Sequence, residues 1–124
     1  MRLIYLAGPY SHDEDSVKKK RVQEMEKALA FFARKAPNLC LYSPIVHWSS
    51  VAFNHDLPDD ATWWMEQDFF MIRKASAMWV LTVEGWKTSF GIGQEIEFAE
   101  SIERDILYVV RDSEGYFLTN DQPD

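Results

Sequence analysis

Short apolar runs alternate along the chain with longer segments in which apolar residues recur at helical spacing. The apolar runs are rich in β-branched and aromatic residues, and they predict buried strands over residues 2–7, 39–43, 77–83 and 106–110. Tyr116-Phe117-Leu118 indicates a further strand at the edge of the sheet. Because strands that alternate with helices build open parallel sheets covered on both faces, we expect an α/β domain of that kind.

Two helices are indicated by their start and stop signals. Ser11-His12-Asp13-Glu14 matches a capping box, in which a hydroxyl is followed three residues later by a carboxylate. The helix that it opens is expected to end at Pro37, because proline cannot continue a helix. Either Asp59 or Asp60 can cap a second helix, which runs to about Lys74.

A third helix is expected over residues 89–104, whereas residues 44–58 are expected to form a long loop that carries His47, Trp48 and His55. In an open parallel sheet, ligands bind beyond the carboxyl ends of the strands. The segments that follow the first three strands are Gly8 to Ser11, Ser43 to Trp48 and Glu84 to Ser89. We expect these segments to come together at a binding site.

Composition and charge narrow the class of protein. The chain has 124 residues, of which 47% are hydrophobic and 27% charged, as in one globular domain. Twenty acidic and thirteen basic side chains give a formal net charge of −7, which opposes extended contact with duplex nucleic acid. No apolar run reaches the ~20 residues of a membrane-spanning helix, and the opening run is too short for a secretory signal. We expect a single domain over 1–124, with its core at about 2–110 and a tail at 111–124.

The single cysteine, Cys40, excludes an internal disulfide framework and fits a reducing compartment, so we expect a cytoplasmic protein. Cys40 stands in an apolar run and is therefore expected to be buried. No cofactor or membrane partner is indicated. The abundant aromatic residues, which exceed what one small core needs, favour a homo-oligomer.

The start of the third helix has the features of an anion site. Ser89 is a good N-cap, and Gly91 and Gly93 leave the first turn without side-chain bulk. A ligand could therefore approach the free backbone N–H groups at the positive end of the helix dipole. The alternative is that serine and glycine simply begin the helix here.

Glu95 lies one turn further along the same helix. At 100° per residue it projects between Ile92 and Ile102, within the apolar stripe, whereas Glu97 projects to the opposite side. A carboxylate on an inward face costs free energy unless it is paired, and beside a binding loop it becomes a candidate nucleophile or acid/base. The alternative is a carboxylate at the edge of the stripe that reaches water.

These motifs resemble those of one enzyme superfamily. Tyr5-Leu6-Ala7-Gly8-Pro9-Tyr10 resembles the opening strand and loop of nucleoside 2-deoxyribosyltransferases, and Gly91-x-x-x-Glu95-Ile96-x-x-Ala99 is similar to their nucleophile motif. Ser89-x-Gly91-x-Gly93-x-Glu95 is also similar to the related 2'-deoxynucleoside 5'-phosphate N-hydrolases. Small bacterial and phage proteins of the same superfamily share a signature seen here at residues 85–92. The resemblance covers about residues 2–110 and implies a flavodoxin-like fold.

The resemblance also implies roles for individual residues. Glu95 would attack the anomeric carbon or stabilise its developing positive charge, and Asp68 would handle the proton of the nucleobase. Tyr5 would orient the nucleophile. Gly8, Pro9 and Tyr10 would line the sugar and base pocket. The alternative for Asp68 is a solvent-facing charge on a helix, and the alternative for Tyr5 is an aromatic residue of the core.

The sequence departs from the superfamily pattern at the end of the third strand. An aspartate is frequent there, but this chain has Thr82, and the nearby Glu84 stands in a loop. The acidic Asp13-Glu14-Asp15 segment argues against capture of a 5'-phosphate beside it. The Lys18-Lys19-Lys20-Arg21 run could offset that charge, although such runs are usually solvated helix faces.

Other candidate sites are weaker. The spacing of His47, His55 and Asp56 matches no standard metal site, so no metal is expected. His47 follows a strand end and is instead a candidate hydrogen-bond donor to a ligand. Trp48 and its neighbours could stack on a base, but tryptophans on amphipathic helices usually belong to a core or an interface.

Three functions follow from these expectations. The first is cleavage or transfer of the N-glycosidic bond of a 2'-deoxyribonucleoside or its 5'-monophosphate, with a small-molecule nucleoside or nucleotide as the partner. The second is a nucleotide-binding sensor without turnover, which the Thr82 departure favours. The third is hydrolysis of the ribosyl bond of a dinucleotide such as NAD.

Overall fold

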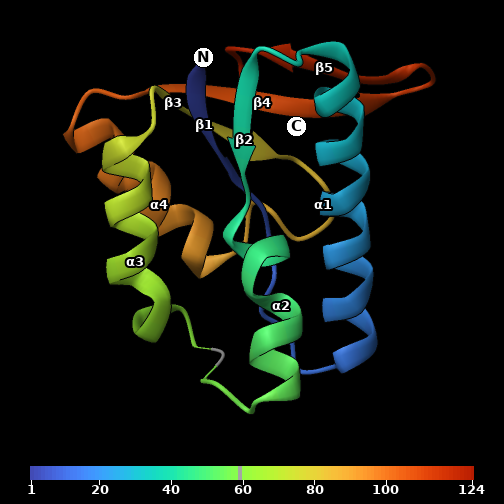
Figure 1. Ribbon diagram of the computed structural model, residues 1–124, viewed down its shortest axis with the longest axis vertical. Helices are drawn as coiled ribbons and strands as arrows, with labels where there is room; N and C mark the ends of the chain where they lie inside the picture. The colour runs from blue at the N-terminus through green and yellow to red at the C-terminus, as the bar shows by residue number, and fades with distance from the viewer. Residues whose placement is uncertain (59) are drawn as a thin grey trace.

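A computed structural model describes residues 1–58 and 60–124 (Figure 1). Its centre is a five-stranded sheet with the order β2-β1-β3-β4-β5. The first four strands pair in parallel, and β5 pairs antiparallel with β4. The strands are β1 (Arg2–Ala7), β2 (Leu39–Tyr42), β3 (Ala77–Leu81), β4 (Asp105–Asp112) and β5 (Gly115–Thr119).

The strand order confirms the predicted α/β, flavodoxin-like fold, because 2-1-3-4-5 is the order of that architecture. The sheet is not entirely parallel, because β5 is antiparallel to β4. The predicted edge strand is present as β5, and it forms a hairpin with β4 in which Tyr108 pairs with Thr119 and Val110 with Phe117. Gly115 begins β5 with a φ of +136°, a conformation that glycine adopts readily. A short connection of this kind can only return the chain antiparallel.

Helices cover both faces of the sheet, as predicted. They are α1 (Asp15–Lys35), α2 (Pro44–Asn54), α3 (Ala61–Lys74) and α4 (Phe90–Ser101). One apolar cluster joins α1 to one sheet face through Met25, Ala28 and Phe32, and Ile45 and Val46 of α2 pack against it. A second cluster joins α3 and α4 to the other face. Figure 1 shows α3 beside α4, with α2 beside the first part of α1.

The strands alternate their side chains between these two clusters. Ile4 and Leu6 of β1 belong to the α1 side, whereas Tyr5 and Ala7 belong to the side of α3 and α4. All five residues of β3 are buried, as expected for a central strand of a parallel sheet. The position of Tyr5 under α4 follows directly from this alternation, and it decides the geometry of the site described below.

The predicted capping box at Ser11-His12-Asp13-Glu14 is wrong. Helix α1 begins at Asp15, and its N-cap Glu14 makes no side-chain capping bond. The preceding residues are instead held in a loop, where Nδ1 of His12 accepts a hydrogen bond from the Glu14 backbone N–H. The carbonyl of Ser11 accepts a hydrogen bond from Arg21, so tertiary contacts override the local pattern.

The long loop predicted over 44–58 is also wrong in part, because residues 44–54 form α2. Its start signals were present in the sequence. The Ser43 side chain accepts a hydrogen bond from the Val46 N–H, and Pro44 occupies the first turn, where its missing N–H costs nothing. Helix α2 contains no charged residue, and its exposed polar side consists of His47, Ser50 and Asn54 at helical spacing.

Two further expectations concern single residues. Asp60 caps α3 through a 2.8 Å hydrogen bond from the Trp63 N–H to its Oδ1, and Asp59, the alternative cap, lies outside the described residues. Cys40 is exposed rather than buried. Leu39 and Leu41 of β2 pack in the cluster on the α1 side, so Cys40 faces the other side of the sheet at its edge strand.

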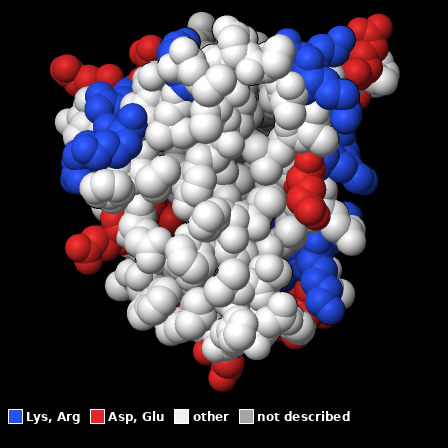
Figure 2. Space-filling model, viewed as in Figure 1, with Lys and Arg blue, Asp and Glu red and all other residues white. Residues whose placement is uncertain are grey.

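The face formed by α2 and α3 is largely uncharged, with charged side chains around its rim (Figure 2). These helices carry exposed Val51, Phe53, Trp63 and Phe70. The homo-oligomer stays a prediction, for which these apolar side chains are the natural contact surface. No helix in the described part of the chain combines the length and the apolar character needed to cross a membrane.

Candidate active site

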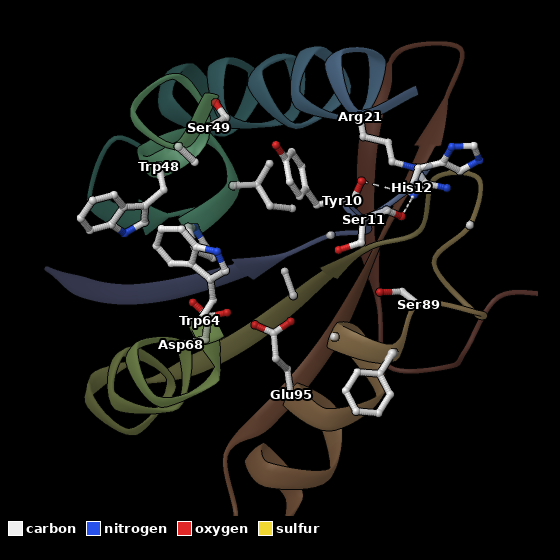
Figure 3. A pocket seen from close by; sticks show the side chains of 18 of the residues that line it. Tyr10, Ser11, His12, Arg21, Trp48, Ser49, Trp64, Asp68, Ser89 and Glu95 are labelled. Atoms are coloured by element: carbon white, nitrogen blue, oxygen red, sulfur yellow. Dashed lines mark hydrogen bonds between the residues drawn. The ribbon is translucent and has the colours of Figure 1, made fainter. Parts of the chain in front are cut away.

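A cavity of about 310 Å³ lies beyond the carboxyl ends of the parallel strands (Figure 3). Its wall comes from the loop after β1, from α2 and α3, and from the segment that leads into α4. The volume is within the range of small-molecule sites. The loops that were expected to meet at this edge of the sheet therefore do meet around one cavity.

Glu95 stands at the base of this cavity and is the buried carboxylate of α4, with 8% of its surface exposed. The Tyr5 hydroxyl, from the neighbouring strand β1, donates a hydrogen bond to its Oε2. Burial raises the pKa of Tyr5 well above its usual range, and the charge of Glu95 raises it further, so Tyr5 remains a donor. Glu97 on the same helix is exposed, as the helical projection predicted.

Asp68 of α3 also lines the cavity (Figure 3). Burial raises the pKa of Asp68 to about 7. Burial and the charge of Asp68 raise the pKa of Glu95 to about 8, opposed by the hydrogen bond from Tyr5. Each carboxylate makes ionisation of the other more costly, so the pair keeps one proton near neutral pH.

A carboxyl pair with one proton can serve as an acid and a nucleophile at once. The Tyr5 hydrogen bond favours the charged form of Glu95, since it donates to a carboxylate oxygen. In the empty cavity the proton lies mainly on Glu95, whose pKa of about 8 is the higher of the two. The productive arrangement, with the proton on Asp68 and the negative charge on Glu95, requires the proton to move between them when a substrate binds. This division suits a substrate that needs a leaving group protonated at one side and a positive centre stabilised at the other.

The N-terminus of α4 closes another side of the cavity. The Ser89 side chain accepts a hydrogen bond from the Ile92 N–H and caps the helix, while Phe90 and Gly91 also line the cavity. The first backbone N–H groups of a helix have no carbonyl partner within it. This edge of the cavity, one helical turn from Glu95, therefore presents the positive end of a helix, which favours an anion.

Arg21 brings a positive charge to this edge, and sequence reasoning missed it. Its Nη1 donates to the Ser11 carbonyl at 2.7 Å and lies 3.5 Å from the Tyr10 carbonyl. A Cβ on Gly85 would collide with the guanidinium, so the glycine makes room for it. Arg21 thus joins the loop after β1 to the loop after β3 while it lines the cavity (Figure 3).

Gly85 has a second reason to be glycine, because its φ of +94° is strained for other residues. The available signal for Arg21 was therefore indirect. The run contains four basic residues, and only their positions around the helix determine which of them faces the loops and which faces solvent. Lys19 and Lys20 are exposed, whereas Arg21 is partly buried.

The opposite end of the cavity is aromatic. Trp48 of α2 and Trp64 of α3 both line it, with ring centroids 5.3 Å apart. The Trp64 indole donates a 2.7 Å hydrogen bond to the Pro58 carbonyl, which fixes the connection between the two helices. Because Asp68 follows Trp64 by one turn, a planar group against these rings would lie near its carboxyl group.

His47 has a different place from the one predicted. Its side chain is exposed, and it is not among the residues that line the cavity. Its ring packs between those of Tyr42 and Trp48, with centroid separations of 5.6 and 5.0 Å. His47 therefore supports Trp48 from behind.

The cavity gathers most of the residues that were singled out from the sequence. Those that line it are Gly8, Tyr10, Asp68, Ser89, Gly91 and Glu95, and Tyr5 reaches it through Glu95. Pro9 is buried outside the cavity lining. Gly93 is exposed, and a Cβ there would meet no atom within 4 Å. Gly8 allows α1 to approach β1, since a Cβ there would collide with Met25.

Comparison with known proteins places the chain in a family. Residues 2–110 match the model of a domain of unknown function, DUF1937. The chain belongs to this family. No curated protein matches the sequence. The matched range spans β1 to β3, most of β4 and the four helices, and it contains each residue of the cavity.

Two features of this DUF1937 domain bear on its chemistry. Thr82, which directly follows β3, donates from its hydroxyl to the Val109 carbonyl of β4 at 2.7 Å, and Glu84 is exposed. Neither residue lines the cavity, so Asp68 and Glu95 are the carboxylates that do so among the described residues. The described residues contain no group of three or more His, Cys, Asp or Glu arranged to hold a metal ion.

Proposed function

We propose that this protein cleaves or transfers the N-glycosidic bond of a 2'-deoxyribonucleoside 5'-monophosphate or of the corresponding nucleoside. The observation that carries the proposal is the buried Glu95, which is held by Tyr5 and faces a nucleoside-sized cavity together with Asp68. The resemblance of the Tyr5 and Glu95 segments to nucleoside 2-deoxyribosyltransferases and N-hydrolases supports the same chemistry.

The reaction assigns one role to each group. As the bond between C1' and the base nitrogen breaks, its electron pair stays on the base, which takes the proton from Asp68 or from a group that Asp68 protonates. The Glu95 carboxylate forms a bond to C1' or stabilises the oxocarbenium-like centre. Water, after giving a proton back to Asp68, then releases the sugar, and a second base in place of water gives transfer.

Between the nucleoside and its monophosphate, the cavity favours the monophosphate. Arg21, the Ser89 cap and the first amides of α4 converge at one edge, and charge-assisted bonds of this type suit a phosphate. Asp13, Glu14 and Asp15, which argued against such a ligand, are exposed and do not line the cavity.

The direct test is to incubate the protein with a panel of 2'-deoxynucleosides and their 5'-monophosphates and to measure free base by chromatography. We expect base release from at least one monophosphate, and exchange when a second base is supplied if transfer is the reaction. Binding of panel members without any release would reject the enzyme in favour of a sensor.

Arg21→Gln is expected to weaken binding of a deoxynucleoside 5'-monophosphate by about tenfold to a hundredfold, because a hydrogen bond to a charged group contributes about 1.5–3 kcal/mol. Binding of the nucleoside should change little. Calorimetric titration of both ligands measures the difference, and Lys20→Gln, which removes an exposed neighbouring charge, is the control. An equal loss for both ligands would show that Arg21 only anchors the loops.

Gly91→Val and Gly93→Val form a matched pair on α4. Gly91 lines the cavity, whereas Gly93 faces open space, so the same side chain should block the ligand only at position 91. We expect Gly91→Val to reduce ligand affinity by at least about tenfold and Gly93→Val to leave it near wild type. Thermal melts of both variants check the fold. Comparable affinities in the two variants would remove the helix N-terminus from the site.

A nucleotide-binding sensor is the second candidate. The observation that favours it is the absence of an acid at Thr82, whose hydroxyl is committed to the Val109 carbonyl. If the reaction requires an acid at the end of β3, a cavity whose carboxylates, among the described residues, are Asp68 and Glu95 would hold the ligand without turning it over. Hydrolysis of a dinucleotide such as NAD remains a third candidate, and it requires room for a second nucleoside.

A further inference from the structure

A second cavity of about 530 Å³ lies between α1 and α2, on the other side of a thin wall from the first. Three residues line both cavities: Tyr10, Ser49 and Ala52. Two of them have small side chains. Figure 3 shows Tyr10 pointing from the first cavity toward α1, with Ser49 on the same side. The two cavities therefore adjoin, with the Tyr10 ring between them.

The second cavity begins beside the anion-binding edge of the first. Lys18, which lines it, is adjacent to Arg21 on the surface of α1, because the two residues are three positions apart on the helix. The backbone carbonyl of Tyr10 accepts a hydrogen bond from Arg21, and Tyr10 lines both cavities. A group attached to a phosphate held at Arg21 would thus lie beside the space between α1 and α2, with Tyr10 at the boundary.

The side chains of the second cavity suit a planar polar group better than another phosphate. Its charges are mixed, since Lys18 lies 3.8 Å from Asp15 and the lining also includes the acidic Glu26. Phe53 presents an aromatic ring with 63% of its surface exposed, and Lys19 lies 5.2 Å from the centre of that ring. An exposed ring beside side-chain amides is a platform on which a nucleobase can stack and form hydrogen bonds. The amides are those of Gln23 and Asn54.

We propose that the ligand of this protein is a dinucleotide, whose second nucleoside occupies the cavity between α1 and α2 and stacks on Phe53. The inference rests on the proposed function, because it extends from the phosphate at Arg21. It also supplies the room that a dinucleotide requires and that the first cavity lacks. The bond cleaved is still the N-glycosidic bond beside Asp68 and Glu95.

The test compares 2'-deoxynucleoside 5'-monophosphates of the four common bases with the symmetric dinucleosides linked 5' to 5' through a diphosphate. Wild-type protein is titrated with each ligand by calorimetry, at a temperature and time scale where turnover is negligible. For the preferred base, the dinucleotide should bind about tenfold more tightly than the monophosphate, because stacking of one base contributes about 1–3 kcal/mol. Phe53→Ala should abolish that advantage and leave the affinity of the monophosphate within about twofold.

Phe70→Ala is the matched control, since Phe70 is another exposed phenylalanine, on α3, and does not line either cavity. It should retain the full advantage of the dinucleotide. Equal affinities for the two ligands in the wild type, or an equal loss of both in Phe53→Ala, would overturn the second subsite and leave the proposed function standing. Failure of every monophosphate and dinucleotide to bind, together with no base release from the nucleosides of the panel, would overturn both.

Discussion

Glu95→Gln is expected to lower the rate of base release by several orders of magnitude while the protein remains folded. The substitution keeps the size of the side chain and its ability to accept the hydrogen bond from Tyr5. It removes the negative charge that would attack or stabilise the anomeric centre. The measurement is the initial rate of base release with the best substrate of the panel, at saturating concentration.

Glu97→Gln is the control for this experiment, because Glu97 is exposed on the opposite side of α4. Its rate should equal that of the wild type. A Glu95→Gln protein that still releases base would remove Glu95 from the mechanism. Because the substitution leaves the shape of the cavity nearly unchanged, the variant should still bind the ligand, which separates a defect in chemistry from one in binding.

The position of Glu95 could be predicted because it depends on local periodicity. A helix capped by Ser89 has a definite set of residues that face the sheet, and Glu95 is one of them. The side chains of β1 alternate between the two faces of the sheet, which places Tyr5 on the same face as α4. The placement of binding segments at one edge also follows from the alternation of strands and helices. These features follow from short-range patterns that can be read directly from the sequence.

Arg21 could not be predicted in the same way, because its role depends on a contact between α1 and two loops. Its neighbours Lys18, Lys19 and Lys20 look equivalent in the sequence, and only the tertiary structure turns one of the four toward Gly85. The same reason explains the misplaced start of α1. Ser11 has the right spacing for a capping box, but its carbonyl is taken by Arg21.

Helix α2 was missed for a different reason. Its sequence has no charged residue, so its polar side, formed by His47, Ser50 and Asn54, contrasts less plainly with the apolar side than a charged stripe would. The Ser43-Pro44 start signal was the better guide. The consequence for the site is substantial, because α2 places Trp48 in the cavity and separates it from the second cavity at Ser49 and Ala52.

The buried carboxyl pair also predicts how stability depends on pH. The pKa of Glu95 in the folded protein is raised to about 8 by burial and by the charge of Asp68, whereas an unfolded glutamate has a pKa of about 4.3. Between these values the folded state binds more protons than the unfolded state. The free energy of unfolding must therefore fall as the pH rises from about 4 to about 8, with little further loss from this group above that window.

Replacing Glu95 with glutamine removes this dependence, since an amide does not ionise. At pH 8, Glu95→Gln should be more stable than the wild type by up to about 4 kcal/mol, which corresponds to a rise of about 15 °C in Tm. At pH 4.5, where Glu95 is largely protonated in the folded state and half-protonated in the unfolded one, the two proteins should have similar Tm values. Thermal melts across this range measure the difference, with Glu97→Gln expected to follow the wild type. A constant gap between Glu95→Gln and the wild type at all pH values would mean that Glu95 is not held as a desolvated, ionisable group. The same burial that destabilises its charge in the empty protein is what would make that charge effective against a positive centre in the cavity.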